Sequence, residues 1–313
     1  MTSWRPRVSS DMSRRIFIGT AAGLWTLEGE TSREVETFAG HAVTALAIDA
    51  DAAWAIIAGS SLWELRERAW RRRAALEGPR ATCLAPARDG LLVGTEQAHL
   101  LRVTDAGVAR IEAFETVEGR EGWYTPWGDP ADVRSIAVAR DGAIHVNVHV
   151  GGVARSRDGG TSWTPTMDIE QDVHQVTAHP REPEIVVVAS AEGFGISRNG
   201  DSWSFVTAGL HAHYCRAVAV AGDHVLVSAA TGFRGRRSAI YRASLDGDPR
   251  FERCRAGLPQ WFDENIDTAC LAAAGRLVVF GTADGRLYRS RDAGTGWELA
   301  LKGLPRVGCV ALG

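Results

Sequence analysis

The chain has 313 residues, with 35 basic and 38 acidic side chains and a formal net charge of −3. This near balance, without a basic tract, argues against nucleic acid as a partner, and no run of about 18 apolar residues predicts a membrane-spanning helix. The five cysteines lie mostly in apolar runs without CxxC spacing. That pattern favours reduced, buried thiols in a cytoplasmic protein over disulfides or a zinc site.

The first element in the chain is the stretch "SRRIFIGTAAGLWTL", from Ser13 to Leu27. Two arginines before an apolar run resemble a twin-arginine export signal, but no A-x-A-like cleavage site follows. The segments "RIFIGT", "GLWTLEG" and "REVETFAG" also parallel "RLVVFGT", "RLYRSRD" and "WELALKGL" near the C-terminus. We therefore expect a mobile arm over residues 1–13 and one folded domain over residues 14–313.

Similar apolar runs then recur along the chain at spacings of 38 to 53 residues. They begin at Val43, Ala81, Val133, Val173, Cys215, Thr268 and Val307. Each of the first six is followed by a second and a third β-rich run and a weaker fourth one, joined by Gly, Asp and Asn turns. Four short strands in a unit of about 40 residues are typical of a β-propeller blade. The sequence thus predicts an all-β, seven-bladed β-propeller of four-stranded antiparallel blades. The C-terminal "VGCVALG" should close the ring as first strand beside three N-terminal strands.

Two predicted turns carry a shared motif. "SRDGGTSW" (156–163) and "SRDAGTGW" (290–297) fit S-x-D-x-G-x-x-W, and "SRNGDSW" (197–203) is a shortened copy. The chain therefore resembles the Asp-box, or BNR, propellers of the sialidase-like and photosystem II assembly factor-like superfamily. The resemblance implies that these boxes stabilise hairpins, through Ser and Asp side chains that bond the backbone, on the face opposite the binding site.

In such propellers the ligand sits at the central axis, beside the connections from fourth to first strand and from second to third strand. Aligning the first runs places ionisable side chains together near this axis, where they would be partly desolvated and would shift one another's pKa values. The catalytic candidates are His174, Arg216, Arg134 and Asp172. Ion pairs that only hold neighbouring blades together are the alternative interpretation.

Further polar and aromatic side chains fall in the same connections. The ligand-binding candidates are His149, His211, His213, Tyr214, Asp132, Asp267, Arg237, Trp127 and Trp261. His149, His174 and His213, with a carboxylate, could hold a divalent transition metal and leave one position open for water. The tryptophans, in two inserted loops, could stack on a planar ligand or pack the loops onto the propeller.

These residues leave several functions open. A sialidase would need an N-terminal F/Y-R-I-P arginine motif and six blades, and xyloglucan-cleaving relatives pair two propellers, so glycoside hydrolysis is the least favoured. The favoured hypothesis is a small polar or anionic ligand in a His/Arg/Asp-rich axial funnel, with metal-assisted hydrolase or lyase chemistry as its enzymatic form. The alternative is a non-enzymatic protein-binding or assembly scaffold, and the sequence does not decide whether the chain is an enzyme.

Overall fold

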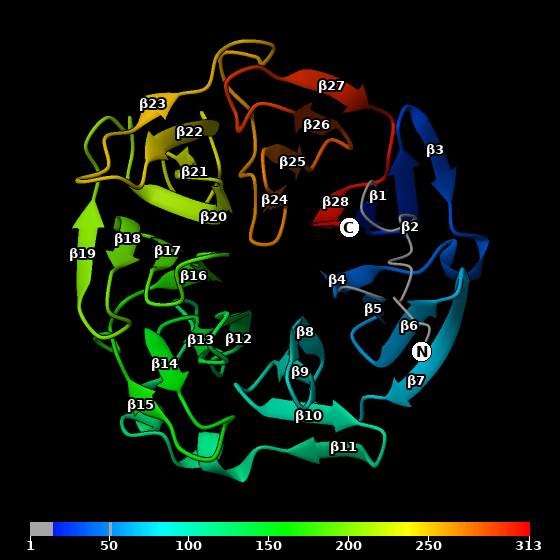
Figure 1. Ribbon diagram of the computed structural model, residues 1–313, viewed down its shortest axis with the longest axis vertical. Helices are drawn as coiled ribbons and strands as arrows, with labels where there is room; N and C mark the ends of the chain where they lie inside the picture. Colours follow the sequence, from blue (N-terminus) through cyan, green and yellow to red (C-terminus); the bar gives the residue numbers. More distant parts are fainter. Residues whose placement is uncertain (1–14, 50–51) are drawn as a thin grey trace, which may run out of the picture.

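The computed structural model describes residues 15–49 and 52–313, and the predicted arm at residues 1–13 lies outside them. The described residues form seven four-stranded antiparallel sheets arranged in a ring (Figure 1). This confirms the predicted seven-bladed β-propeller. The described part of the chain contains no helix of the length and apolarity needed to cross a membrane.

Each blade is named here by its first strand, which lies next to the axis. The first strands are β4 (Val43–Ile48), β8 (Ala81–Ala87), β12 (Val133–Val138), β16 (Val173–Ala178), β20 (Tyr214–Ala221), β24 (Leu271–Ala274) and β28 (Val307–Leu312). The second strands are β5 (Ala53–Ile57), β9 (Gly90–Thr95), β13 (Ile144–Val148), β17 (Val186–Ser190), β21 (His224–Ala230), β25 (Leu277–Gly281) and β1 (Arg15–Thr20).

The third and fourth strands lead outward to the rim. The third strands are β6 (Ser61–Arg66), β10 (Leu100–Thr104), β14 (Val153–Ser156), β18 (Gly193–Ser197), β22 (Ala239–Ser244), β26 (Leu287–Ser290) and β2 (Gly23–Glu28). The fourth strands are β7 (Ala69–Ala75), β11 (Gly107–Arg110), β15 (Thr164–Pro165), β19 (Trp203–Val206), β23 (Glu252–Arg253), β27 (Glu298–Leu301) and β3 (Thr31–Glu34). Short 3-10 helices, η1 (Glu36–Phe38), η2 (Glu112–Thr116) and η3 (Arg120–Gly122), lie in the connections.

Burial follows strand position. The second strands are apolar and almost wholly buried, as in β17, whereas β3 and β11 on the rim are exposed throughout. The core is divided into clusters that lie between neighbouring blades; one, for example, joins Val187 and Phe194 of the β16 blade to Val227 of the β20 blade. Apolar contact between blades therefore holds the ring together.

The ring closes where the two ends of the described chain meet. Ile16 pairs with Leu312 and Ile18 with Val310, so β28 and β1 join the C-terminus to the N-terminal strands. The stretch that resembles an export signal thus supplies β1 and most of β2 of the β28 blade. A first-strand position predicted near Thr268 is wrong, because β24 begins only at Leu271 and residues 267–270 form a turn, with the Cys270 amide donating to the Asp267 carbonyl.

The two clean motif copies form closely similar turns. In the first, Ser156 Oγ accepts from the Gly160 amide at 2.7 Å, and Asp158 Oδ1 accepts from the Ser162 amide at 2.9 Å. In the second, Ser290 Oγ accepts from the Gly294 amide at 2.8 Å. Because strands alternate in direction, these third-to-fourth turns lie on the face opposite the connections that carry the candidate site residues.

Candidate functional site

The candidate site lies at the start of the first strands, on the face where blades are connected to one another. Asp132 and Asp172 directly precede β12 and β16, and His149 directly follows β13. The amide of His149 donates to the Asp132 carbonyl, and the amide of Val173 donates to the His149 carbonyl. Backbone hydrogen bonds thus fix these side chains at the junction of the β12 and β16 blades.

His149 lies between two carboxylates. Its Nδ1 donates to Asp132 Oδ1 at 3.2 Å, and its Nε2 lies 3.4 Å from Asp172 Oδ1. The imidazole is 1% exposed. An imidazole whose Nδ1 hydrogen is held by a carboxylate keeps Nε2 as its acceptor nitrogen, the tautomer found for metal-binding histidines, and here Arg134 Nη1 lies 3.4 Å from that Nε2.

His174 is held in the same tautomer by a different group. Its Nδ1 donates to the Cys215 carbonyl at 2.6 Å, which leaves Nε2 as the free nitrogen. That Nε2 lies 3.3 Å from Asp172 Oδ1, yet both atoms are buried without a hydrogen-bond partner. Two buried acceptor atoms that face each other at this distance lack a positive group or a proton donor between them.

Arg134 occupies the centre of the site. Its Nη1 lies 3.2 and 3.4 Å from the two ring nitrogens of His149, and its Nη2 donates to Thr268 Oγ1 at 3.3 Å. Within the described part of the chain, no carboxylate forms an ion pair with Arg134. The predicted alternative, arginines that only pair with aspartates, therefore does not describe this side chain.

Arg216 does form such a pair. Its Nη1 donates to Asp267 Oδ1 at 2.8 Å, and its Nη2 donates to the Tyr214 hydroxyl at 3.1 Å. The guanidinium also lies over the Tyr214 ring, 5.4 Å from its centroid. Arg216 thus connects the β20 blade to the turn before β24, as the ion-pair interpretation expects.

The carboxylates of the site are held in the charged form. Burial alone would raise the pKa of Asp132, but the hydrogen bond from His149 and the charge of Arg134 outweigh it, so that pKa lies below its ordinary value. Burial is likewise outweighed at Asp267 by the charge of Arg216. Burial lowers the pKa of His174, which keeps this imidazole neutral.

Aromatic rings cover the two imidazoles. Trp127 packs edge-on against His149, with ring centroids 4.8 Å apart, and the indole is 62% exposed. Tyr214 packs against His174 at 4.8 Å, and burial raises the pKa of its hydroxyl. The aromatic side chain predicted in the inserted loop at Trp127 therefore lies directly beside the site.

The remaining predicted residues lie elsewhere. His211 and Trp261 pack together at 4.7 Å, with Arg237 5.2 Å from the Trp261 centroid, in a hollow at the outer side of the β20 blade. Arg253 also lies over Trp261, at 4.5 Å, so this indole already has cationic partners. His213 is exposed and lines a separate shallow hollow next to Tyr214. The structure does not bring these four residues into the His149 group.

Thr268 and Gln175 are site residues that the sequence analysis did not identify. The Thr268 hydroxyl donates to the His174 carbonyl at 3.1 Å and lies 3.3 Å from the Arg216 carbonyl. Gln175 Oε1 accepts from the Ala269 amide at 3.2 Å. Ala269 has a left-handed φ of 61°, which carries the turn toward the axis. The sequence analysis expected a strand from Thr268, so it did not identify the turn at residues 267–270. Of the predicted site residues, only Asp267 lies in this turn.

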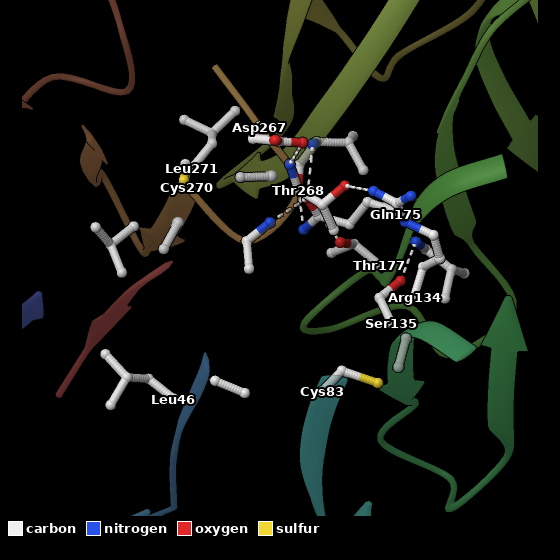
Figure 2. Close-up of a pocket in the computed structure, with 18 of the residues that line it drawn as sticks. Leu46, Cys83, Arg134, Ser135, Gln175, Thr177, Asp267, Thr268, Cys270 and Leu271 are labelled. Atoms are coloured by element: carbon white, nitrogen blue, oxygen red, sulfur yellow. Dashed lines mark hydrogen bonds between the residues drawn. The ribbon is translucent and has the colours of Figure 1, made fainter. Parts of the chain in front are cut away.

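A cavity of about 680 Å³ runs along the axis beside these residues. Asp132, Arg134, Asp267 and Thr268 are among the side chains that line it. In Figure 2, Thr268, Gln175 and Arg134 lie on one side of the open space, and Leu46 and Cys83 lie across it. The cavity is wide because Thr44, Thr82 and Gly308 stand where the β12, β16 and β20 blades carry Arg134, His174 and Arg216.

No protein-family model matches the chain, and no curated protein matches it in sequence. Virginiamycin B lyase from Staphylococcus aureus superposes with a TM-score of 0.62 and 11% identity, covering 85% of this chain and 87% of the lyase. The GH74 xyloglucanase from Xanthomonas campestris gives 0.68 and 17%, covering 93% of this chain and 53% of the enzyme. PorZ, a type-IX secretion component of Porphyromonas gingivalis, gives 0.58 and 13%, covering 82% of this chain and 32% of PorZ.

These similarities show the propeller fold alone. A lyase, a glycoside hydrolase and a secretion component share it, which illustrates that the fold does not determine the activity. The function of this chain must therefore be argued from its own axial residues.

Two of the three donor-atom separations in one group match those around a tetrahedral metal ion. One donor atom each from His149, Asp172 and His174 lies within 4.8 Å of the others. A tetrahedral zinc ion with donors at 2.0–2.1 Å needs donor atoms about 3.3–3.4 Å apart. The two nitrogen-to-carboxylate distances here are 3.4 and 3.3 Å. Two imidazoles and one carboxylate also leave coordination positions open.

Proposed function

We propose that this propeller binds a divalent transition metal through His149, Asp172 and His174, and a small anionic ligand beside it at Arg134. One observation carries the proposal: Asp172 Oδ1 and His174 Nε2 are buried, unpartnered and 3.3 Å apart. A cation between them would convert an unfavourable contact into two coordination bonds.

The net charge of the site favours the binding of a cation, and it favours the binding of an anion only after that cation is bound. Asp132, Asp172 and Asp267 contribute three negative charges, and Arg134 and Arg216 contribute two positive ones. These five side chains sum to −1, which opposes the binding of an anion. A divalent ion would change the sum to +1, and Arg134 would then have a favourable ligand to bind.

The arrangement suits metal-assisted hydrolysis or elimination. A metal in such a site supplies a Lewis acid and lowers the pKa of bound water. Asp132 and the Cys215 carbonyl would orient the two imidazoles. Arg134, half-buried and without an ion pair, would hold the negative group of the substrate at the wall of the axial cavity.

A partner-binding scaffold is the second candidate function. Its support is the exposure of two large aromatic side chains on the site face, Trp127 at 62% and Phe233 at 69%. Exposed aromatic residues are enriched in protein interfaces. The scaffold hypothesis predicts that Trp127 matters for binding while the buried imidazoles do not.

Two broader proposals accompany the site. The serine and aspartate hydrogen bonds of the 156–163 and 290–297 turns support membership of the Asp-box propellers. All five cysteines are buried and free, which supports residence in a reducing compartment such as the cytoplasm.

The test is the metal content of untagged protein after incubation with zinc, manganese or iron(II) and removal of free ion. We expect about one equivalent in the wild-type protein and in His224→Ala, a half-buried control outside the site, and a loss of at least tenfold in affinity for His174→Ala and Asp172→Asn. His213→Ala separates the proposed ligand set from one that includes His213, and it should retain the metal.

Metal-free wild-type protein, or equal metal content in His174→Ala, would overturn the metal site. Loss of the metal in His213→Ala but not in Asp172→Asn would replace the carboxylate ligand by His213. Circular dichroism of each variant, measured alongside, separates loss of the ligand from loss of the fold.

A further inference from the structure

The axial cavity changes character along its length. Its end at the site face carries Asp132, Arg134, Asp267 and Thr268. Farther along the first strands its wall is formed mainly by aliphatic side chains: Leu46, Ile136, Val138, Val176, Val220 and Leu271. From Arg134 to Val138 the cavity follows β12 for four residues, or about 13 Å.

The polar side chains along this wall have their hydrogen-bonding groups engaged by the backbone. Gln175 Nε2 donates to the Val218 carbonyl at 3.1 Å, and its Oε1 accepts from the Ala269 amide. Thr177 Oγ1 donates to the Val218 carbonyl at 3.3 Å. Ser135 Oγ accepts from the Val176 amide at 2.8 Å. A molecule in this part of the cavity meets mostly apolar surface.

Arg134 stands at the boundary between the two parts. It lines the cavity and is hydrogen-bonded to His149 and Thr268, and no carboxylate of the described residues forms an ion pair with it. An anionic group bound there would leave the rest of its molecule facing the aliphatic wall. Burial of an alkyl chain against that wall is favourable by about 0.8 kcal/mol per methylene.

From this arrangement we infer that the axial ligand is an amphipathic anion, with its charged group at Arg134 and an alkyl or similarly apolar chain along β12. The inference rests on the proposed anion site and adds the chemical class of the ligand. An unbranched carboxylate of medium length has this chemistry.

The experiment measures the affinity of zinc-loaded wild-type protein for acetate, butyrate, hexanoate and octanoate by calorimetry, below micellar concentrations. We expect the affinity to rise about fourfold per added methylene. Octylammonium, with the same chain and the opposite charge, should bind at least tenfold more weakly than octanoate. Arg134→Gln should weaken all the carboxylates alike.

Two variants test where the chain lies. Val138→Phe and Ala273→Leu each add volume to the aliphatic part of the cavity, and they should remove the advantage of octanoate over butyrate while butyrate affinity is kept. Val138→Thr is the matched control, because it keeps the size of the side chain. The two filling variants lie on different strands, so misfolding of one leaves the other informative.

The outcomes separate this inference from the proposed function. Affinity that does not change with chain length, in protein that binds metal through His174, overturns the inference and leaves the proposed site standing. If no carboxylate binds to metal-loaded protein, the anion site itself fails and the inference fails with it. Octanoate affinity unchanged in both filling variants also overturns the inference.

Discussion

Three of the buried histidines of this propeller have different hydrogen-bonding surroundings. His174 donates from Nδ1 to a carbonyl, and His179 Nδ1 accepts from the Arg181 and Glu182 amides. His145 Nδ1 has no hydrogen-bond partner. Its burial, with the charge of Arg155 as the next cause, lowers the pKa of His145 to about 4. His145 is not one of the proposed metal ligands, so its protonation can be tested separately from the site.

This pKa predicts a pH dependence of stability. Above pH 6.5 His145 is neutral in both the folded and unfolded chain, so it contributes no pH dependence. As the pH falls from 6.5 toward 4, the unfolded chain takes up a proton that the folded protein excludes, and stability is lost. Between pH 7 and pH 5 this site should cost about 2 kcal/mol of the free energy of unfolding.

His145→Phe removes the titrating group at similar size. Urea unfolding at pH 7 and pH 5 should show a loss smaller by about 2 kcal/mol in the variant than in the wild-type protein. The remaining loss belongs to other groups, His174 included, whose pKa burial also lowers. Equal losses in the two proteins would show that His145 is protonated within the fold.

At the level of single residues, the sequence predicted the site in part. Aligned first strands brought out Asp132, Arg134, Asp172 and His174 because the repeat places equivalent positions at equal depth beside the axis. The alignment could not place His213, the third predicted imidazole ligand, in the same way. His213 lies in an irregular connection, where spacing along the chain does not determine the direction of a side chain.

Among the strands, contact between blades depends on matched residue sizes. In three blades a second-strand glycine faces the valine that begins the next blade. A Cβ added at Gly94 would lie 2.4 Å from Val133 Cγ1. The corresponding distances are 2.8 Å from Gly19 to Val43 Cγ1 and 2.2 Å from Gly281 to Val307 Cγ1. The β4 blade has Ile56 at the equivalent place, and the next blade begins with the smaller Ala81. Large and small side chains thus alternate across the junction.

Gly94→Ala tests this packing. The added methyl group would overlap Val133 and Cys83 Sγ, which lies 2.6 Å away, so we expect a loss of about 2 kcal/mol in the free energy of unfolding. Gly308→Ala is the matched control, since the nearest atom to its added Cβ lies 3.8 Å away. The control should change stability by less than about 0.5 kcal/mol in urea denaturation.

A Gly94→Ala protein as stable as the control would mean that the β8 and β12 blades can separate without cost. The prediction concerns strand packing rather than the site, because Gly94 contacts none of the proposed ligands.

The repeats in the sequence made the strands themselves predictable. The late start of β24 was not predictable, because "TACLAAA" continues the apolar pattern through the turn at Thr268.

On the scale of the whole molecule, one blade is assembled from both ends of the described chain. β28 lies between β1, with which it pairs, and the neighbouring inner strands β4 and β24. Val307, Cys309 and Val310 of β28 are buried. The sequence predicted this closure because the incomplete N-terminal unit and the extra C-terminal run complement each other, and a propeller leaves no stable alternative for an unpaired inner strand.

Removal of residues 307–313 should therefore abolish cooperative unfolding, since β1 would expose an unpaired edge and two neighbouring blades would lose buried contacts. A circular permutant that runs from Gly142 to Gly313 and on from Met1 to Asp141 is the matched control. The two ends of the described chain already meet, since the Gly313 amide donates to the Arg15 carbonyl at 2.9 Å, and residues 1–14 serve as the linker. The permutant also divides the β12 blade into one C-terminal and three N-terminal strands, the same division that the β28 blade has naturally.

Thermal unfolding followed by circular dichroism should show one transition for the permutant and none for the truncated chain. A cooperative transition in the truncated chain would show that six blades and three strands suffice, and that the pairing of β28 with β1 is dispensable for the ring.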